Sequence, residues 1–273
     1  MNRVANSAKT VLITGASSGL GAALAREYAR RGARLVLLAR RVTRLQELAQ
    51  QLRASGRQVL VCAGDVTVDG SVAGAVAAAQ QAGWPIDVVI ANAGYSVAGT
   101  LQKLSLADYR RQYETNVFGV LRTAYESLAA LRSSGGRLVI MGSVAGHAAA
   151  PGASAYASSK FAVRALADSL RGDLGQEGVG LTLLSPGFID SDIRRIDNRG
   201  ALHADAPDPI PEWVRMRAPA AARQMVNAID RGRAEQVLTF HGRLIVFLAR
   251  HFPALVRRFA LRYVRWRKQP GTG

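Results

Sequence analysis

The stretch from Thr10 to residue 31 constrains the fold more than any other part of this sequence. A short apolar run, Thr10–Thr14, is followed at once by the glycine-rich segment GASSGLG and then by a helix-forming run at 22–31. In the order strand, turn, helix, such glycines let backbone amides approach a pyrophosphate, and the helix N-terminus adds donors and a positive dipole end. A glycine turn alone would be weak evidence, since any tight turn uses glycine. Its position between a strand and a helix predicts a dinucleotide-binding turn.

The same alternation of apolar runs and helical patterns continues along most of the chain. We expect further strands at 34–39, 58–63, 86–91, 137–141, 180–185 and 236–239, and further helices at 43–54, 68–82, 106–132, from 155 onward and at 220–231. Repeated βα units whose strands are apolar throughout imply a parallel sheet covered on both faces. The expected fold class is therefore α/β, a Rossmann-type doubly wound parallel sheet of about seven strands with helices on both faces.

The chain shows no internal boundary that would divide this sheet. No linker rich in Pro, Ser or Gly and no internal repeat is visible, so we expect one domain over 1–242, with a C-terminal extension over 243–273. Within the domain, a polar, proline-dotted stretch leads to Trp213 and Met216. A long irregular segment in a compact domain is more often a lid than a connector, which predicts a substrate lid at about 188–217.

Chemistry is expected where the strands end. Ligands of open parallel sheets bind at the carboxyl ends of the strands. Polar or glycine residues occupy this position after several of the predicted strands, namely Gly15, Arg40, Asp65, Asn92 and Ser143.

Tyr156 and Lys160 are four residues apart in a segment expected to be helical, so the phenol and the ammonium lie one turn apart on one face. A nearby cation favours the phenolate and lowers the pKa of tyrosine towards the range of a proton donor at neutral pH. Ser143, at the end of an apolar run, would hold the oxygen of a carbonyl or alcohol against that phenol. Taken alone, the pair would more often be an exposed helix face, because tyrosine and lysine are common on helices.

The end of the second strand indicates which dinucleotide is bound. An acidic residue about 20 residues past the glycines is typical of an NAD site, where it binds the ribose hydroxyls. This chain has Ala39 and Arg40 there. Because a guanidinium can bond a 2′-phosphate at two points, the pattern favours NADP(H) over NAD(H). A solvated arginine at a strand end is the alternative.

Several motifs occur in a recognisable order over residues 10–240, and here the sequence resembles the short-chain dehydrogenase/reductase family. The family's cofactor turn is resembled by Thr14-Gly15-x-x-x-Gly19-x-Gly21, and its catalytic tetrad by Asn116, Ser143, Tyr156 and Lys160. The residues expected to bind the cofactor are Gly15, Ser17, Ser18, Gly19, Leu20, Gly21, Arg40, Asp65, Val66, Asn92, Ala93, Gly94, Tyr156, Lys160, Pro186, Gly187, Ile189 and Ser191.

The resemblance implies an oxidoreductase that moves a hydride between nicotinamide and a ketone or secondary alcohol. In the family's mechanism Tyr156 would donate the proton, Lys160 would bind the nicotinamide ribose and lower the pKa of Tyr156, Ser143 would polarise the carbonyl, and Asn116 would hold a water. Ser18 departs from the lysine or arginine of many NADPH-dependent members, which removes one of two expected phosphate contacts, and Ser191 replaces a usual threonine. A non-catalytic NADP(H)-binding regulatory or scaffold protein on the same fold is the alternative.

Composition bears on compartment and partners. Lys plus Arg number 36 against 19 Asp plus Glu, and no acidic residue follows Glu235. The positive charges after Glu235 are interleaved with a broad apolar face and not with isolated aromatic residues, which argues against nucleic acid. A single cysteine, Cys62, excludes an intrachain disulfide and any multi-cysteine metal site, so no metal is expected. The first ten residues carry no apolar signal segment, and we expect a cytoplasmic homo-oligomer.

The C-terminal extension suggests a membrane contact. On a helical wheel, 254–268 places Leu, Phe, Tyr and Trp side chains opposite arginines, and Pro253 predicts two helical segments with a bend between them. Neither apolar run reaches the ~20 residues that span a bilayer. An arginine-rich amphipathic helix is typical of one lying in an anionic membrane interface, here through 243–268 on the inner face of a membrane. Packing on the protein itself or on a second subunit is the alternative. We expect a hydrophobic or lipid-like ketone or alcohol substrate, with Val97, Ala98, Ala148, Ala149, Trp213 and Met216 as candidate lining.

Overall fold

The computed structural model of this chain describes residues 8–191, 193, 197–198, 208 and 210–258. In this part of the chain, seven strands form one parallel sheet in the order β3-β2-β1-β4-β5-β6-β7. Their bounds are β1 (Thr10–Thr14), β2 (Arg34–Ala39), β3 (Val59–Ala63), β4 (Val88–Ala91), β5 (Arg137–Met141), β6 (Gly180–Ser185) and β7 (Glu235–Val237). The expected fold class is confirmed.

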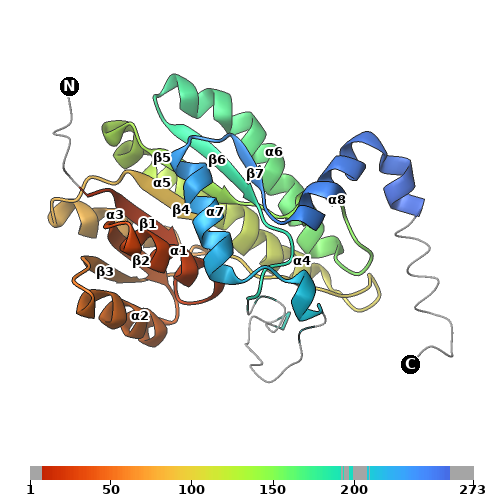
Figure 1. Cartoon of the computed structure of the whole chain (residues 1–273), viewed down its shortest axis with the longest axis horizontal. Helices are drawn as coiled ribbons and strands as arrows, with labels where there is room; N and C mark the ends of the chain where they lie inside the picture. The colour runs from red at the N-terminus through yellow and green to blue at the C-terminus, as the bar shows by residue number, and fades with distance from the viewer. Residues whose placement is uncertain (1–7, 192, 194–196, 199–207, 209, 259–273) are drawn as a thin grey trace.

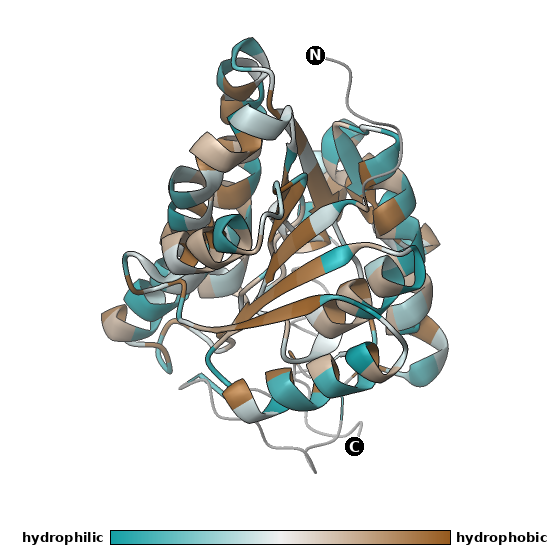
Figure 2. Cartoon of the chain, turned by 90° about the vertical axis from the view of Figure 1, so that its left-hand side faces the viewer, coloured by the Kyte–Doolittle hydropathy of each residue, from teal (hydrophilic) through white to brown (hydrophobic). Residues whose placement is uncertain are grey.

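Helices cover both faces of this sheet, as Figures 1 and 2 show. The helices are α1 (Gly19–Arg30), α2 (Val42–Ala54), α3 (Ser71–Gln81), α4 (Leu106–Tyr113), α5 (Gly119–Ser134), α6 (Ser154–Gln176), α7 (Ala218–Asp230) and α8 (Phe240–His251). Side chains of α1, α2 and α7 form one core cluster with one face of the sheet, while α3, α5 and α6 form another with the opposite face. Alternate strand residues serve the two layers, for example Val11 and Ile13 on one side and Leu12 on the other.

The sheet order creates the place where a ligand can bind. The chain moves outward from β1 to β2 and β3 and then returns to place β4 on the other side of β1. The connections after β1 and β4 therefore leave the sheet in opposite directions and open a crevice at the carboxyl ends of these strands.

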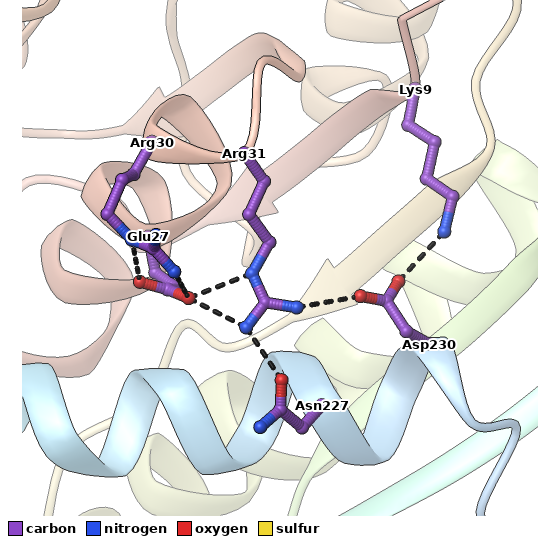
Figure 3. A network of polar contacts seen from close by, with 6 residues as sticks. All are labelled: Lys9, Glu27, Arg30, Arg31, Asn227 and Asp230. Atoms are coloured by element: carbon purple, nitrogen blue, oxygen red, sulfur yellow. Dashed lines mark hydrogen bonds and ion pairs between the residues drawn. The ribbon is translucent and has the colours of Figure 1, made fainter.

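A polar network centred on the buried Glu27 fixes α1 against α7 (Figure 3). Glu27 of α1 accepts hydrogen bonds from Arg30 and Arg31, and its side chain is only 8% exposed. Arg31 continues to Asp230 and Asn227 of α7 at 2.9 and 2.7 Å, and Lys9 donates to Asp230 at 2.8 Å. The hydrogen bond from Arg30, followed by those from Arg31, lowers the pKa of Glu27 to about 2. This network holds in place the helix whose N-terminus faces the crevice.

The expected helix at 106–132 has an interruption that its sequence pattern does not show. Residues Glu114–Phe118 form a π-helical turn, η1, between α4 and α5. A π-helical turn accommodates one extra residue within the helix, and Asn116 lies in the middle of this turn. Such turns are frequent at functional sites, because the extra residue redirects a side chain.

The C-terminal part of the described chain runs past the sheet as a separate arm (Figure 1). Helix α8 begins at Phe240, before the expected boundary at 243. The chain leaves the helix at Phe252 and resumes helical geometry from Pro253 to residue 258, which confirms the bend expected at this proline. Positions 259–268 of the predicted amphipathic helix and most of the predicted lid, at 192, 194–196, 199–207 and 209, lie outside the described residues. No helix among the described residues has the length and apolar content needed to cross a membrane.

Candidate active site

The glycine turn after β1 packs directly against the segment after β4. Gly15 has a φ of +66°, which favours glycine, and a Cβ there would lie 2.8 Å from the Cα of Ala93. A Cβ on Gly21 would lie 2.4 Å from the carbonyl oxygen of Gly15. Asn92 donates from Nδ2 to the carbonyl oxygens of Thr14 and Gly15 at 2.9 and 3.3 Å. These contacts keep the backbone of the turn open towards the crevice.

A cavity of about 490 Å³ lies in this crevice and runs between the glycine turn and α6. It is lined by all of the predicted cofactor residues except two: Gly15, Ser17, Ser18, Gly19, Leu20, Gly21, Arg40, Asp65, Val66, Asn92, Ala93, Gly94, Tyr156, Lys160, Pro186 and Ser191. The two exceptions are Gly187, which packs beside Thr239 and His241, and Ile189, which is 3% exposed and lies in the hydrophobic core. The sequence interpretation did not single out Arg41, Tyr95, Thr115 and Gly142, which also line it.

Two arginines line this cavity directly after β2, and the sequence pattern singled out only one of them. Arg40 is mostly exposed, with its guanidinium 3.6 Å from the carboxylate of Asp65. Arg41 turns back to the glycine turn and donates to the hydroxyls of Ser18 at 2.6 Å and Ser17 at 3.3 Å. A guanidinium thus lies at Ser18, the position where the resemblance led us to expect a cationic side chain. The Arg-Arg pair in the sequence was the signal that could have indicated this role.

Lys160 is the buried charge of the site. Its ammonium donates to the carbonyl oxygen of Met141 at 2.7 Å and lies 5.9 Å from the centre of the Tyr156 ring. Both residues belong to α6, which begins at Ser154, so the one-turn spacing is as expected. Burial lowers the pKa of Lys160 to about 8. Removing the charge of a lysine from water costs free energy. A buried lysine therefore indicates a functional site in which the positive charge has a role.

Asn116 lies in the π-helical turn and is fully buried. Its Nδ2 donates to the carbonyl oxygen of Tyr95 at 3.1 Å and to the hydroxyl of Ser159 at 3.2 Å, while Oδ1 accepts from the Tyr95 amide at 3.2 Å. The side chain therefore bridges the segment after β4 to α6. Its amide is engaged with protein groups, whereas the resemblance implied that it would hold a water.

Ser143 follows β5 and opens a short helical turn, η2 (Val144–Gly146). Its hydroxyl accepts a hydrogen bond from the Ala145 amide at 3.1 Å, and Met141 and Gly142, directly before it, line the cavity. A Cβ on Gly146 would lie 2.6 Å from the carbonyl oxygen of Lys160. The turn that carries Ser143 is thus pressed against the turn of α6 that carries Lys160.

The candidate substrate residues do not line the cavity, whose lining includes none of the six. Val97 is completely buried in a small core cluster, and Met216 is partly buried against the main core. Trp213, in the short helix η4 (Glu212–Val214), is 87% exposed.

The site suits a nicotinamide dinucleotide. One cavity contains the start of α1 with its backbone amides and the glycine turn, whose space any side chain would fill. The same cavity contains two arginines and a tyrosine beside a buried lysine. Among the described residues there is no group of three or more His, Cys, Asp or Glu side chains that could hold a metal ion.

Comparison with known proteins agrees with this arrangement. Residues 9–201 match the family described as short chain dehydrogenase. A similar protein from Bos taurus, "Dehydrogenase/reductase SDR family member 7B", is 38% identical over 190 residues, which make up 67% of this chain and 58% of the bovine protein. The chain therefore spans little more than half the length of this curated relative.

Two solved structures are similar over almost their whole length. One is a short-chain dehydrogenase from Sphingobium yanoikuyae in complex with NADPH, with 27% identity and a TM-score of 0.73 over 97% of this chain and 98% of the other. The second, from Burkholderia phymatum in complex with NAD, has 26% identity and a TM-score of 0.77 over 98% of each chain. The chain belongs to the short-chain dehydrogenase/reductase family of NAD(P)-dependent oxidoreductases.

Proposed function

We propose that this protein is an NADPH-dependent carbonyl reductase or alcohol dehydrogenase. The observation that carries the proposal is that Tyr156 and Lys160 share one cavity with the glycine turn. A phenol beside an ammonium is suited to donate a proton to a carbonyl oxygen in reduction, and to accept one from an alcohol in oxidation.

In this proposal the nicotinamide supplies or accepts the hydride, and the chain supplies binding, orientation and the proton. Tyr156 donates its phenolic proton to the substrate oxygen, and the Ser143 hydroxyl donates a hydrogen bond to the same oxygen. Lys160 favours the phenolate form of Tyr156 by its charge and would hold the nicotinamide ribose. Asn116 holds the segment after β4 against α6 through its hydrogen bonds to Tyr95 and Ser159.

The preference for NADP(H) rests on Arg40 and Arg41. Both line the cavity beside Ala39, where an acidic side chain would repel a 2′-phosphate. The relative from Sphingobium yanoikuyae, solved in complex with NADPH, supports this assignment. The relative solved with NAD shows that members of the family bind either cofactor.

The alternative function is that of a non-catalytic NADP(H)-binding regulatory or scaffold protein. The pairing of the Lys160 ammonium with the Tyr156 phenol favours the enzyme, because a protein that only binds the cofactor would need the lysine but not a phenol beside it.

A hydrophobic or lipid-like substrate is proposed from the surface beside the site. The exposed apolar side chains of α8 form a line at spacings of four and three residues, Phe240, Leu244 and Phe247, which we call the α8 stripe. Phe252 and Leu255 extend it past the bend and are also about half exposed. No acidic residue follows Glu235, so the charged side chains of α8 and of the chain after it are all cationic. This combination suits an anionic membrane surface, and we propose that residues 243–268 make such a contact.

We further propose a cytoplasmic homo-oligomer that meets the inner face of a membrane through this arm. Large exposed side chains on η1, α5 and α6, among them Phe118, Tyr125 and Phe161, offer apolar surface to a second subunit. Size-exclusion chromatography with light scattering measures this assembly.

The experiment that tests the function is NADPH oxidation, followed by absorbance, with ketones ranging from short polar compounds to long-chain lipids. We expect turnover with the apolar ketones, and none when Tyr156 is replaced by Phe. Tight NADPH binding, with neither turnover of any ketone nor oxidation of any matching alcohol by NADP, would favour the non-catalytic alternative.

A further inference from the structure

We propose that His147 is a positioning residue, which holds the turn carrying Ser143 through a network with Glu235, Ser185 and Arg250. The inference rests on the proposed function, since it assigns how one catalytic side chain is kept in place. It concerns residues that lie outside the cavity.

His147 directly ends the η2 turn, four residues after Ser143. Its side chain is 1% exposed, and its backbone amide donates to the carbonyl oxygen of Val144 at 3.0 Å. The ring and the turn therefore form one compact unit. A shift of the ring would move Ser143 relative to Tyr156 and Lys160, because Gly146 of the same turn lies against the backbone of Lys160.

The ring is held by residues from two neighbouring strands. Its Nε2 lies 3.0 Å from Oε1 of Glu235 at the start of β7 and 3.3 Å from the hydroxyl of Ser185 at the end of β6. Ser185 donates to the same Glu235 oxygen at 3.3 Å. The hydrogen bond from His147 is the largest cause that lowers the pKa of Glu235 to about 2, so the carboxylate is ionised at neutral pH.

These contacts define which nitrogen of the His147 ring donates a hydrogen bond. Within the described residues, Nδ1 of His147 is buried without a hydrogen-bond partner. A bare lone pair is the cheaper group to leave in that position, since a buried unpaired N–H would cost more. Nε2 is therefore the ring nitrogen whose N–H donates to Glu235, and the charge of the carboxylate is balanced by a second partner.

Arg250 of α8 supplies that balance. It donates to the second oxygen of Glu235 at 2.8 Å. The opposite end of α8 also meets the catalytic loops, because Gly242 packs against Val144 and Gly187, and the Val144 amide donates to the carbonyl oxygen of Pro186 at 3.0 Å. Helix α8 thus contacts the Ser143 turn at its N-terminus directly and near its C-terminus through Glu235 and His147.

A double-mutant cycle tests whether His147 acts through Ser143. His147→Leu should lower kcat roughly 10- to 100-fold, the size expected for a small misplacement of a catalytic group, with the Kd for NADPH unchanged. In a Ser143→Ala background the same substitution should have little further effect. An equal loss of kcat in both backgrounds, or a His147→Leu enzyme as fast as the wild type, would overturn the proposal.

A conservative variant separates positioning from simple loss of fold. The amide of His147→Gln can donate to Glu235 as Nε2 does, so this variant should recover most of the rate that His147→Leu loses. If His147→Leu does not fold, His147→Gln and Arg250→Met still give a result. Arg250→Met should lower kcat with NADPH binding kept, whereas Arg257→Met, which removes an exposed arginine beyond α8, should not. Equal rates for the two arginine variants would remove Arg250 from the network.

Amide hydrogen exchange provides a readout that needs no turnover. Residues 143–148 should exchange faster in His147→Leu than in the wild type, and as slowly as the wild type in His147→Gln. Faster exchange in a protein that reduces no ketone would leave the positioning network standing while the proposed function fails. Unchanged exchange in His147→Leu would show that the ring does not hold the turn.

Discussion

The ammonium nitrogen of Lys160 lies 5.9 Å from the centre of the Tyr156 ring, one turn further along α6. The same nitrogen is buried and bonded to the carbonyl oxygen of Met141 at the end of β5. The position of the ammonium is therefore fixed by both α6 and β5. Substitution of Tyr156 and substitution of Lys160 test the proton donor and the charge separately.

Replacing Tyr156 by Phe should reduce turnover by roughly 10²–10⁴-fold, the usual cost of losing a general acid. The substitution removes one oxygen, so fold and NADPH affinity should stay nearly intact. Steady-state rates and NADPH titration by fluorescence measure both quantities. Tyr125→Phe, on the exposed face of α5, is the matched control and should be inert. A Tyr156→Phe enzyme with a wild-type rate would disprove the role of this phenol.

Burial of Lys160 predicts a pH dependence of stability. Its pKa falls from an ordinary 10.5 to about 8 in the fold, so the unfolded chain holds more protons between these values. The free energy of unfolding should therefore gain a contribution as pH rises from 8 to 10.5, up to about 3 kcal/mol for the whole shift. Lys160→Met should lose this contribution and also lose turnover. Urea unfolding of both proteins without cofactor at several pH values measures the difference, and identical pH slopes would show that the ammonium is not desolvated.

The two arginines should discriminate between cofactors. Arg40→Ala or Arg41→Ala should each weaken NADPH binding by about 1.5–3 kcal/mol, the worth of a hydrogen bond to a charged group, with little effect on NADH. Arg44→Ala, an exposed arginine in α2, is the control for a loss of charge nearby. Calorimetric titration with both cofactors gives the comparison. Equal losses for NADPH and NADH would mean that neither guanidinium reads the 2′-phosphate.

The sequence predicted the sheet and most of the cavity because both follow from local patterns. Apolar runs marked each strand, and the ends of parallel strands must meet along one edge, so Gly15, Asp65 and Asn92 were placed correctly without coordinates. Arg41 was missed because its contact with Ser17 and Ser18 depends on the direction of the backbone where α2 begins, which the sequence pattern does not show. The π-helical turn at Asn116 was missed because one added residue barely alters a helical pattern.

The contacts between distant residues could not be predicted at all. His147 and Glu235 are separated by 88 positions, and nothing in the local pattern of either one indicates the other. The same holds for the network between Glu27 and Asp230, which depends on how α1 and α7 lie side by side (Figure 3).

That network should make the protein sensitive to acid. The pKa of Glu27 is lowered from 4.5 to about 2, so its contribution to stability is complete above pH 4.5 and is lost as pH falls towards 2. Glu27→Gln should cost about 2 kcal/mol at pH 7, less than the about 3 kcal/mol of the whole shift, because the arginines are partly in water. Glu47→Gln, on the exposed face of α2, is the control. Chemical unfolding at pH 7 and pH 3 measures the effect. A Glu27→Gln protein as stable as the wild type at pH 7 would show that the network does not stabilise the fold.

The α8 stripe should bind anionic membrane. Aromatic and aliphatic side chains at Phe240, Leu244 and Phe247 are exposed, and only cations follow Glu235 in the sequence, so apolar insertion and charge attraction come from the same part of the chain. Full-length protein should sediment with vesicles that contain anionic lipid, less so with neutral vesicles, and salt should weaken the binding. A double variant, Leu244→Ser with Phe247→Ser, should reduce sedimentation without altering turnover of a short water-soluble ketone.

The choice of variant follows from the structure. A chain ending near Gly242 would also remove Arg250 and most of a helix that packs on the Ser143 turn, so a loss of binding could not be separated from a loss of site geometry. Serine at two exposed positions leaves those contacts in place, and Val68→Ser with Leu106→Ser, two exposed apolar residues outside α8, is the matched control. If the full-length protein stays in the supernatant with both kinds of vesicle at low salt, the membrane contact is wrong. If the double variant then changes the oligomer size by light scattering, the α8 stripe is a contact between subunits.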